Sequence, residues 1–271
     1  MIRVGISGWR YAGWRGVFYP RGLPQRRELE HAAGRLSTIE VNGSFYSLQR
    51  PSSWRAWAAA VPEDFVFSVK GPRFITHMKK LADPEVPLAN FFATGVLSLG
   101  DRLGPVLWQL PPQVTFRPDR LAAFFDALPR RTTSAAELAR AHHEPDRLVE
   151  GADTEVPVDR PLRHVLEVRH ESFRTPEFCE LLRAHDVGMV VSDSAGTWPM
   201  FDEVTSDVVY VRLHGDEELY ASGYGPEALA RWADRSRAWD AAELDVFVYF
   251  DNDVKVHAPF DAIALADLLR D

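Results

Sequence analysis

The chain has 271 residues, with 31 Lys and Arg against 39 Asp and Glu, which gives a formal net charge of −8. Hydrophobic residues make up 46% of the sequence and aromatic residues 11%, a composition that argues against an intrinsically disordered chain. The acidic balance argues against a broad binding surface for duplex DNA, because such a surface needs a basic face.

Three further absences narrow the class of protein. The sequence has no run of roughly 18 apolar residues, so no membrane-spanning segment is expected. Residues 1–6 run directly into a strand-like pattern in place of a signal peptide, and we therefore expect a cytoplasmic protein. The single cysteine, Cys179, excludes a disulfide within the chain and is interpreted as a packing residue of a helix.

Eight short runs rich in β-branched or aromatic residues predict strands, and most are almost continuously apolar, as in strands covered on both faces. These runs are residues 2–7, 38–42, 65–70, 105–110, 164–168, 188–192, 208–213 and 246–250. Helical patterns separate most of them, at residues 24–35, 52–61, 88–103, 118–128, 175–185, 226–239 and 262–269.

The alternation of eight strands with helices predicts an α/β fold with a parallel sheet, and eight strands close a (β/α)8 barrel of about 250 residues. We therefore predict a single TIM-type barrel domain over residues 1–271. An open doubly wound sheet is the alternative, but the turn after the first strand lacks its glycine-rich phosphate motif. Two irregularities are expected: residues 193–207 are too poor in helix formers for a full sixth helix, and residues 130–161 form an insertion between strands four and five, with an added helix at 135–141.

Polar side chains gather at the carboxyl ends of the predicted strands, where barrel enzymes carry their catalytic groups. Alternation along the second strand points Glu40 and Asn42 into the barrel. The corresponding positions of the other strands are Ser68, Lys70, Gln109, Glu167, Arg169, Asp193, Tyr210, Arg212, His214 and residues 251–253. Because buried charges are unfavourable unless paired, these groups form either a substrate site or a closed layer of ion pairs inside the barrel.

Acid–base catalysis on a small polar or anionic substrate, of the hydrolase or isomerase type, is the favoured interpretation. The catalytic candidates are Glu40, Glu167, His214 and Lys70, with a glutamate as base and His214 or Lys70 as acid. Arginine forks bind phosphate or carboxylate, and aromatic rings stack on sugars or bases. The substrate-binding candidates are therefore Trp9, Asn42, Tyr46, His77, Gln109, Arg169, Asp193, Arg212 and Asn252.

Two other functions stay open. A metal could be bound by four strand-end residues, Glu40, Glu167, Asp193 and His214. However, Lys70, Arg169 and Arg212 balance their charge and no zinc-ligand spacing is present, so no bound metal or cofactor is expected. Basic residues in the loops after strands one and three alternate with aromatic residues, which suits binding of single-stranded nucleic acid. They are Arg10, Arg15, Lys70, Arg73, Lys79 and Lys80. The oligomeric state is not predicted.

A series of short motifs runs in a fixed order from residue 5 to the C-terminus. It includes Ser7-Gly8-Trp9, Glu40-Val41-Asn42-Gly43-Ser44-Phe45-Tyr46, Phe67-Ser68-Val69-Lys70, Gln109-Leu110-Pro111-Pro112, Glu167-Val168-Arg169-His170, Tyr210-Val211-Arg212-Leu213-His214-Gly215 and Asp251-Asn252-Asp253. Together they resemble the domain-of-unknown-function 72 (YecE-like) family. The resemblance implies a TIM-type barrel and no established activity; the likeness of this family to endonuclease IV and sugar isomerases suggests DNA or sugar phosphates as ligands. Asp251 stands where the family pattern has Asn, which makes the rim of the barrel more acidic.

Overall fold

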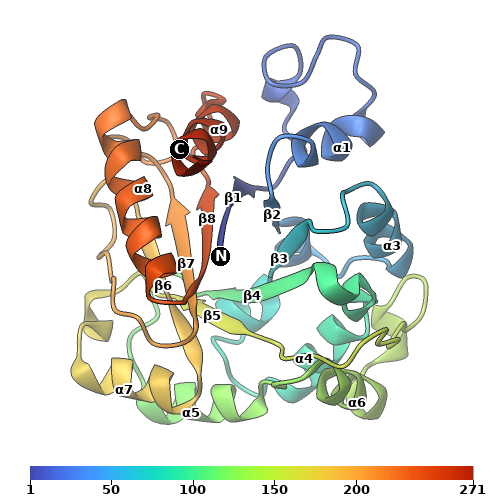
Figure 1. Cartoon of the computed structure of the whole chain (residues 1–271). Coiled ribbons are helices and arrows are strands. Elements are labelled where there is room, and N and C mark those ends of the chain that lie inside the picture. The colour runs from blue at the N-terminus through green and yellow to red at the C-terminus, as the bar shows by residue number, and fades with distance from the viewer. Residues whose placement is uncertain (271) are drawn as a thin grey trace.

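The centre of the fold is a closed barrel of eight parallel strands, in which each strand pairs with the next in sequence and β8 pairs with β1 (Figure 1). The structure is a computed structural model, and it describes residues 1–270. The strands are β1 Ile2–Ser7, β2 Thr38–Val41, β3 Val66–Lys70, β4 Leu103–Gln109, β5 His164–Glu167, β6 Val187–Asp193, β7 Val208–Leu213 and β8 Asp245–Phe250. Each of the eight predicted strands is present, and the predicted TIM-type (β/α)8 barrel is confirmed.

Helices surround the barrel, and α8 and α9 lie side by side against β8 (Figure 1). The α-helices are α1 Glu28–Ala33, α2 Gly43–Tyr46, α3 Pro51–Ala59, α4 Glu85–Phe92, α5 Pro118–Ala127, α6 Thr132–His142, α7 Pro176–Ala184, α8 Pro226–Ala241 and α9 His257–Arg270. Shorter turns of helix are η1 Ala12–Trp14, η2 Gln25–Arg27, η3 Phe74–Met78, η4 Val96–Arg102, η5 Pro145–Arg147 and η6 Glu171–Phe173. Within residues 1–270, no helix has the length and apolar character needed to cross a bilayer.

Both predicted irregularities are confirmed, and one predicted helix is wrong. Residues 194–207, all of them described, contain no helix between β6 and β7, and the insertion carries α6, which packs against α4. The helix expected at residues 88–103 is instead α4 and η4, and η4 is itself interrupted at Gly100. Gly95 separates them with a φ of 87°, a left-handed conformation that ends a helix and that glycine adopts without strain.

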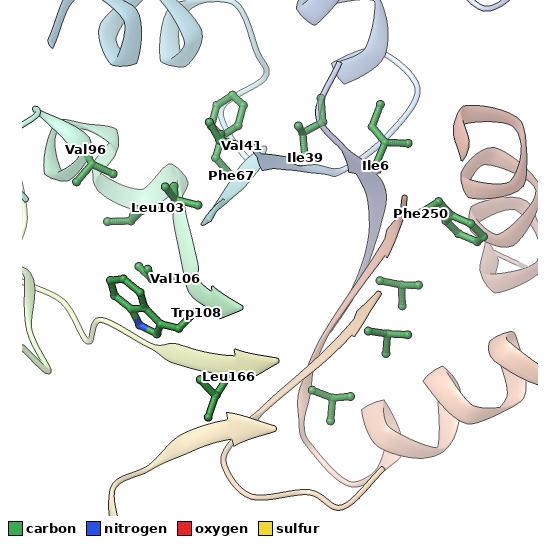
Figure 2. Close-up of a cluster of buried hydrophobic side chains, with 14 of the residues drawn as sticks. Ile6, Ile39, Val41, Phe67, Val96, Leu103, Val106, Trp108, Leu166 and Phe250 are labelled. Carbon is green, nitrogen blue, oxygen red and sulfur yellow. The ribbon is translucent and has the colours of Figure 1, made fainter. Parts of the chain in front are cut away.

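The apolar core lies mainly between the barrel and its helices. Figure 2 shows side chains such as Ile6, Ile39 and Trp108 pointing away from the barrel interior, where they are fully buried. The alternate strand positions point inward and fill the lower interior with a second apolar cluster. That cluster is Val66, Leu107, Val165, Val190, Val208, Tyr210, Phe247 and Tyr249. The inward positions nearer the carboxyl ends of the strands are polar, so the charged residues meet above this apolar floor.

Candidate active site at the barrel mouth

A single arginine joins three carboxylates near the carboxyl ends of the strands. Arg212 Nε and Nη2 donate hydrogen bonds of 3.0 and 2.9 Å to Glu40, and Nη1 donates one of 2.8 Å to Glu167. Nη2 also donates to Asp251 at 2.8 Å, and Nη1 lies 3.4 Å from His214 Nε2. We call Glu40, Glu167, Arg212 and Asp251 the ion-pair layer. The N–H groups of Arg212 all face these carboxylates or His214, so Arg212 offers none to a substrate in this arrangement.

The ion-pair layer is largely buried. Glu40, Glu167 and Arg212 have no exposed surface. Burial alone would raise the pKa of Glu167, but Arg169 and Arg212 hold it well below its usual range. Burial would likewise lower the pKa of Arg212, but the neighbouring carboxylates raise it well above its ordinary value. The Tyr210 hydroxyl donates a 2.7 Å hydrogen bond to Glu40 and completes the layer from below. These residues therefore form the closed layer of ion pairs that the sequence allows as the alternative to a substrate site.

Two further cations, Arg169 and Lys70, lie at the mouth, and only Arg169 is paired with a carboxylate. Arg169 Nε donates a 2.6 Å hydrogen bond to Glu167, and its guanidinium carbon lies 3.8 Å from the centroid of the Trp198 ring. Lys70 Nζ lies 4.4 Å from the centroid of the Phe45 ring and has no hydrogen bond or ion pair to any residue from 1 to 270. Burial lowers the pKa of Lys70 to about 8, with Arg212 acting in the same direction.

Two histidines of the mouth are held neutral. Burial, followed by Lys70 and Arg169, lowers the pKa of His77 to about 4. The His77 Nδ1 atom lies 2.9 Å from the Thr76 hydroxyl. Burial also lowers the pKa of His214, whose Nδ1 atom is 3.1 Å from Asp251 Oδ2 but outside hydrogen-bond geometry. His77 therefore faces the cations of the mouth as an uncharged imidazole.

Four aromatic side chains close over these groups. Trp198 and Tyr220 lie edge-on to the His214 ring, with centroids 5.9 and 5.3 Å away. Phe45 supports Lys70, and the Tyr11 hydroxyl donates to the Ser7 carbonyl at 2.5 Å. Trp198 is not among the residues predicted from the sequence, because it lies beyond the end of β6, where the alternation of inward and outward positions stops. Asp251 is predicted at the mouth, within residues 251–253, but not as a substrate-binding residue.

The other substrate-binding candidates do not all reach the mouth. Gln109 is buried, and its side-chain amide donates to the Leu110 carbonyl at 2.8 Å. Asp193 accepts a 3.2 Å hydrogen bond from the Tyr224 hydroxyl. The Oδ1 atom of Asn42 is buried without a hydrogen-bond partner among the described residues.

Three candidates point elsewhere. Trp9 packs edge-on against Trp57 at 5.2 Å in the outer core, because Gly8 turns the chain with a φ of 83°. Asn252 donates to Asp261 at 2.8 Å and so points toward α9. Tyr46 is exposed beside the mouth, outside the ion-pair layer. Their predicted roles in substrate binding gain no support from these positions.

The same arrangement bears on the two alternative functions. The four suggested metal ligands form no metal site, since no group of three His, Cys, Asp or Glu side chains in residues 1–270 is arranged to hold a metal ion. Arg212 occupies the point at which the carboxylates meet. The basic loops are partly neutralised, since Arg15 pairs with the buried Glu28 at 2.7 Å.

Comparison with known proteins agrees with this barrel and its motifs. The family described as a protein of unknown function, DUF72, matches residues 3–271, nearly the whole chain. The chain belongs to the DUF72 family. The resemblance inferred from the short motifs is therefore confirmed, and it brings no known activity with it.

Two curated relatives of this DUF72 chain have names without a function. The chain is 31% identical to the UPF0759 protein YecE of Escherichia coli over 132 residues. These residues cover 48% of this chain and 45% of YecE. It is 26% identical to the UPF0759 protein YunF of Bacillus subtilis over 127 residues. These residues cover 45% of this chain and 44% of YunF. The match thus spans less than half the length of either relative.

Solved DUF72 structures share the fold over the full chain. A DUF72 family protein from Thermotoga maritima superposes with a TM-score of 0.78 at 24% identity, covering 100% of both chains. Another from Enterococcus faecalis gives a TM-score of 0.75 at 17% identity, covering 100% of this chain and 96% of that one. At these identities the likeness shows the barrel alone.

Proposed function

We propose that this DUF72 protein is an enzyme that binds a small anionic, sugar-like or phosphorylated substrate at the barrel mouth and transfers protons with Lys70. One observation carries the proposal: the Lys70 ammonium group has no ion-pair partner within residues 1–270, whereas Arg212 and Arg169 are bound to carboxylates. Isolated buried charge is unfavourable, so a protein retains it where a ligand or a reaction uses it.

The surroundings of Lys70 suit proton transfer. A group whose pKa is about 8 exchanges its proton readily near neutral pH, which is what a general acid or base requires. The glutamates of the ion-pair layer are less suited to this task, because Arg212 keeps them paired. We therefore assign Glu40 and Glu167 to positioning and charge balance, and proton transfer to Lys70.

Arg169 supplies the second half of an anion site. Its Nε atom is fixed by Glu167, while its Nη groups have no hydrogen-bond partner in the described part of the chain. A planar guanidinium held in this way presents a fork that phosphate and carboxylate oxygens fit. Because Trp198 stacks on this guanidinium, entry of a substrate requires that side chain to move.

Replacement of Lys70 by methionine is expected to weaken anion binding at least tenfold, because methionine keeps the apolar stem and removes the charge. Isothermal titration with inorganic phosphate, ribose 5-phosphate and gluconate measures the effect. Lys79→Met is the matched control, since Lys79 lies outside the mouth and pairs with Asp83 at 3.3 Å. The proposal is wrong if the wild-type protein binds none of the three anions, or if Lys70→Met binds them as tightly as Lys79→Met does.

A further inference from the structure

A groove with a volume of about 720 Å³ lies beside the barrel mouth, between α2, η3, the start of α4 and η5 of the insertion. This volume falls within the range of small-molecule sites. Its walls are largely apolar, and several of its large side chains are exposed. They are Tyr46, Phe74, Met78 and Val86. Exposed apolar side chains that gather in one hollow mark a binding site more often than isolated ones do.

One cation of the groove, Arg73, is available to an anionic ligand. Lys79 pairs with Asp83 at 3.3 Å, and Arg147 pairs with Glu144 at 3.5 Å. Arg73 has neither an ion pair nor a side-chain hydrogen bond among residues 1–270, and its guanidinium carbon lies 5.9 Å from the centroid of the Tyr46 ring. Glu85, the remaining carboxylate of the groove, lies 3.3 Å from the His142 imidazole. Arg73 is therefore the groove cation that lacks a partner among the described residues, and it lies next to an aromatic wall.

The backbone that forms the groove is held in uncommon conformations. The segment η3 is a π-helix, a form that is rare and frequent at functional sites. Lys80, Leu81 and Asp83, which follow it, have φ angles of 49°, 67° and 40°. Non-glycine residues adopt this left-handed region at a free-energy cost, and such residues cluster at ligand-binding sites.

The insertion at residues 130–161 forms the side of the groove opposite η3. Asn90 Nδ2 donates to the Glu144 carboxylate at 2.9 Å, and the Glu144 backbone N–H donates to Asn90 Oδ1 at 2.7 Å. These two bonds hold η5 against α4, so the insertion completes a groove that the barrel loops alone would leave open. The groove is thus preformed in this structure.

We infer that this groove is a second binding site, which takes a small aromatic acid with its ring among Tyr46, Phe74 and Met78 and its anionic group on Arg73. The site is distinct from the ion-pair layer and from Lys70, because none of these residues lines the groove; Phe45 lines the groove and also contacts Lys70. The inference does not depend on the reaction proposed for the mouth. It assigns a role to the insertion and to Tyr46, which the mouth does not use.

Two fluorescent probes test the site. Anilinonaphthalene sulfonate is an aromatic anion, and N-phenylnaphthylamine is a neutral compound of similar ring structure. We expect the wild-type protein to bind both, Phe74→Ser to weaken both at least tenfold, and Arg73→Gln to weaken only the anion to that extent. Circular dichroism confirms that the variants are folded.

Met200→Ser is the matched control, because Met200 is exposed outside the groove. It is expected to bind both probes as the wild type does, and so is Lys70→Met, which separates this site from the mouth. Absence of binding to the wild type, equal weakening by Met200→Ser and Phe74→Ser, or equal effects of Arg73→Gln on the two probes would each overturn the inference.

Discussion

Replacement of Arg212 by methionine is expected to prevent folding or to lower the free energy of unfolding by about 3–5 kcal/mol. The guanidinium group is the common partner of Glu40, Glu167 and Asp251, and the first two have no exposed surface. Methionine fills much of the same volume but leaves these carboxylates without their counter-charge. Glu40 and Glu167 would then have to accept protons, or water would have to enter the barrel to solvate them.

Urea unfolding followed by circular dichroism measures this effect. Arg27→Met makes the same chemical change at an exposed pair, Arg27 with Glu30 at 3.0 Å, and is expected to alter the unfolding midpoint little. An Arg212→Met protein that unfolds at the same urea concentration as Arg27→Met would show that the ion-pair layer does not stabilise the barrel.

The stability of the protein is expected to fall with acidification in a way that depends on His164. This residue lies on the outer side of β5 and is buried, and burial lowers its pKa to about 3 from the ordinary 6.5. Trp108 Nε1 donates to His164 Nδ1 at 3.1 Å, and His164 Nε2 lies 2.8 Å from the Pro129 carbonyl. Both ring nitrogens are thus occupied in a neutral tautomer, which leaves no place for a second proton.

The direction in which the free energy of unfolding changes with pH follows from proton linkage. Below about pH 6.5 the unfolded chain binds a proton at His164 and the folded protein does not, so stability is lost as the pH falls. Between about pH 6.5 and pH 4.5 the loss from this residue is about 2 kcal/mol. Asp253 opposes it, because burial and Asp251 raise the pKa of Asp253 to about 6.

A His164→Gln variant isolates the contribution of the histidine. The difference in free energy of unfolding between wild type and variant, measured at each pH by urea unfolding, is expected to shrink by about 2 kcal/mol over that interval. Because Asp253 is present in both proteins, its effect cancels. A difference that stays constant with pH would mean that His164 keeps its ordinary ionisation in the folded protein.

The fold could be predicted from the sequence because the barrel strands carry a simple pattern. Short apolar runs and the helices between them specify eight strands, and alternation places Glu40 and Arg212 on the inner side. The pattern does not reveal the helix boundary at Gly95, because apolar residues continue through it while the backbone turns there. Periodicity reports which face is buried and does not report a single left-handed residue.

The candidate site was harder to predict, since it depends on distances between residues far apart in the chain. Alternation identifies Glu40, Glu167 and Arg212 as inward-facing, but it does not show that one guanidinium takes up both carboxylates. Nor does it distinguish a paired cation such as Arg169 from the unpaired Lys70. The groove could not be predicted at all, because no sequence pattern specifies a π-helix such as η3.

The ionisation of Lys70 tests the central claim most directly. The ¹³Cε chemical shift of a lysine reports its protonation, and the chain has only three other lysines, Lys79, Lys80 and Lys255, so the spectrum of Lys70→Met assigns the signal. We predict a titration midpoint for Lys70 near pH 8 that rises when inorganic phosphate is added in excess, because a bound anion favours the ammonium form. A midpoint at the ordinary lysine value of about 10.4, unchanged by phosphate, would contradict the account.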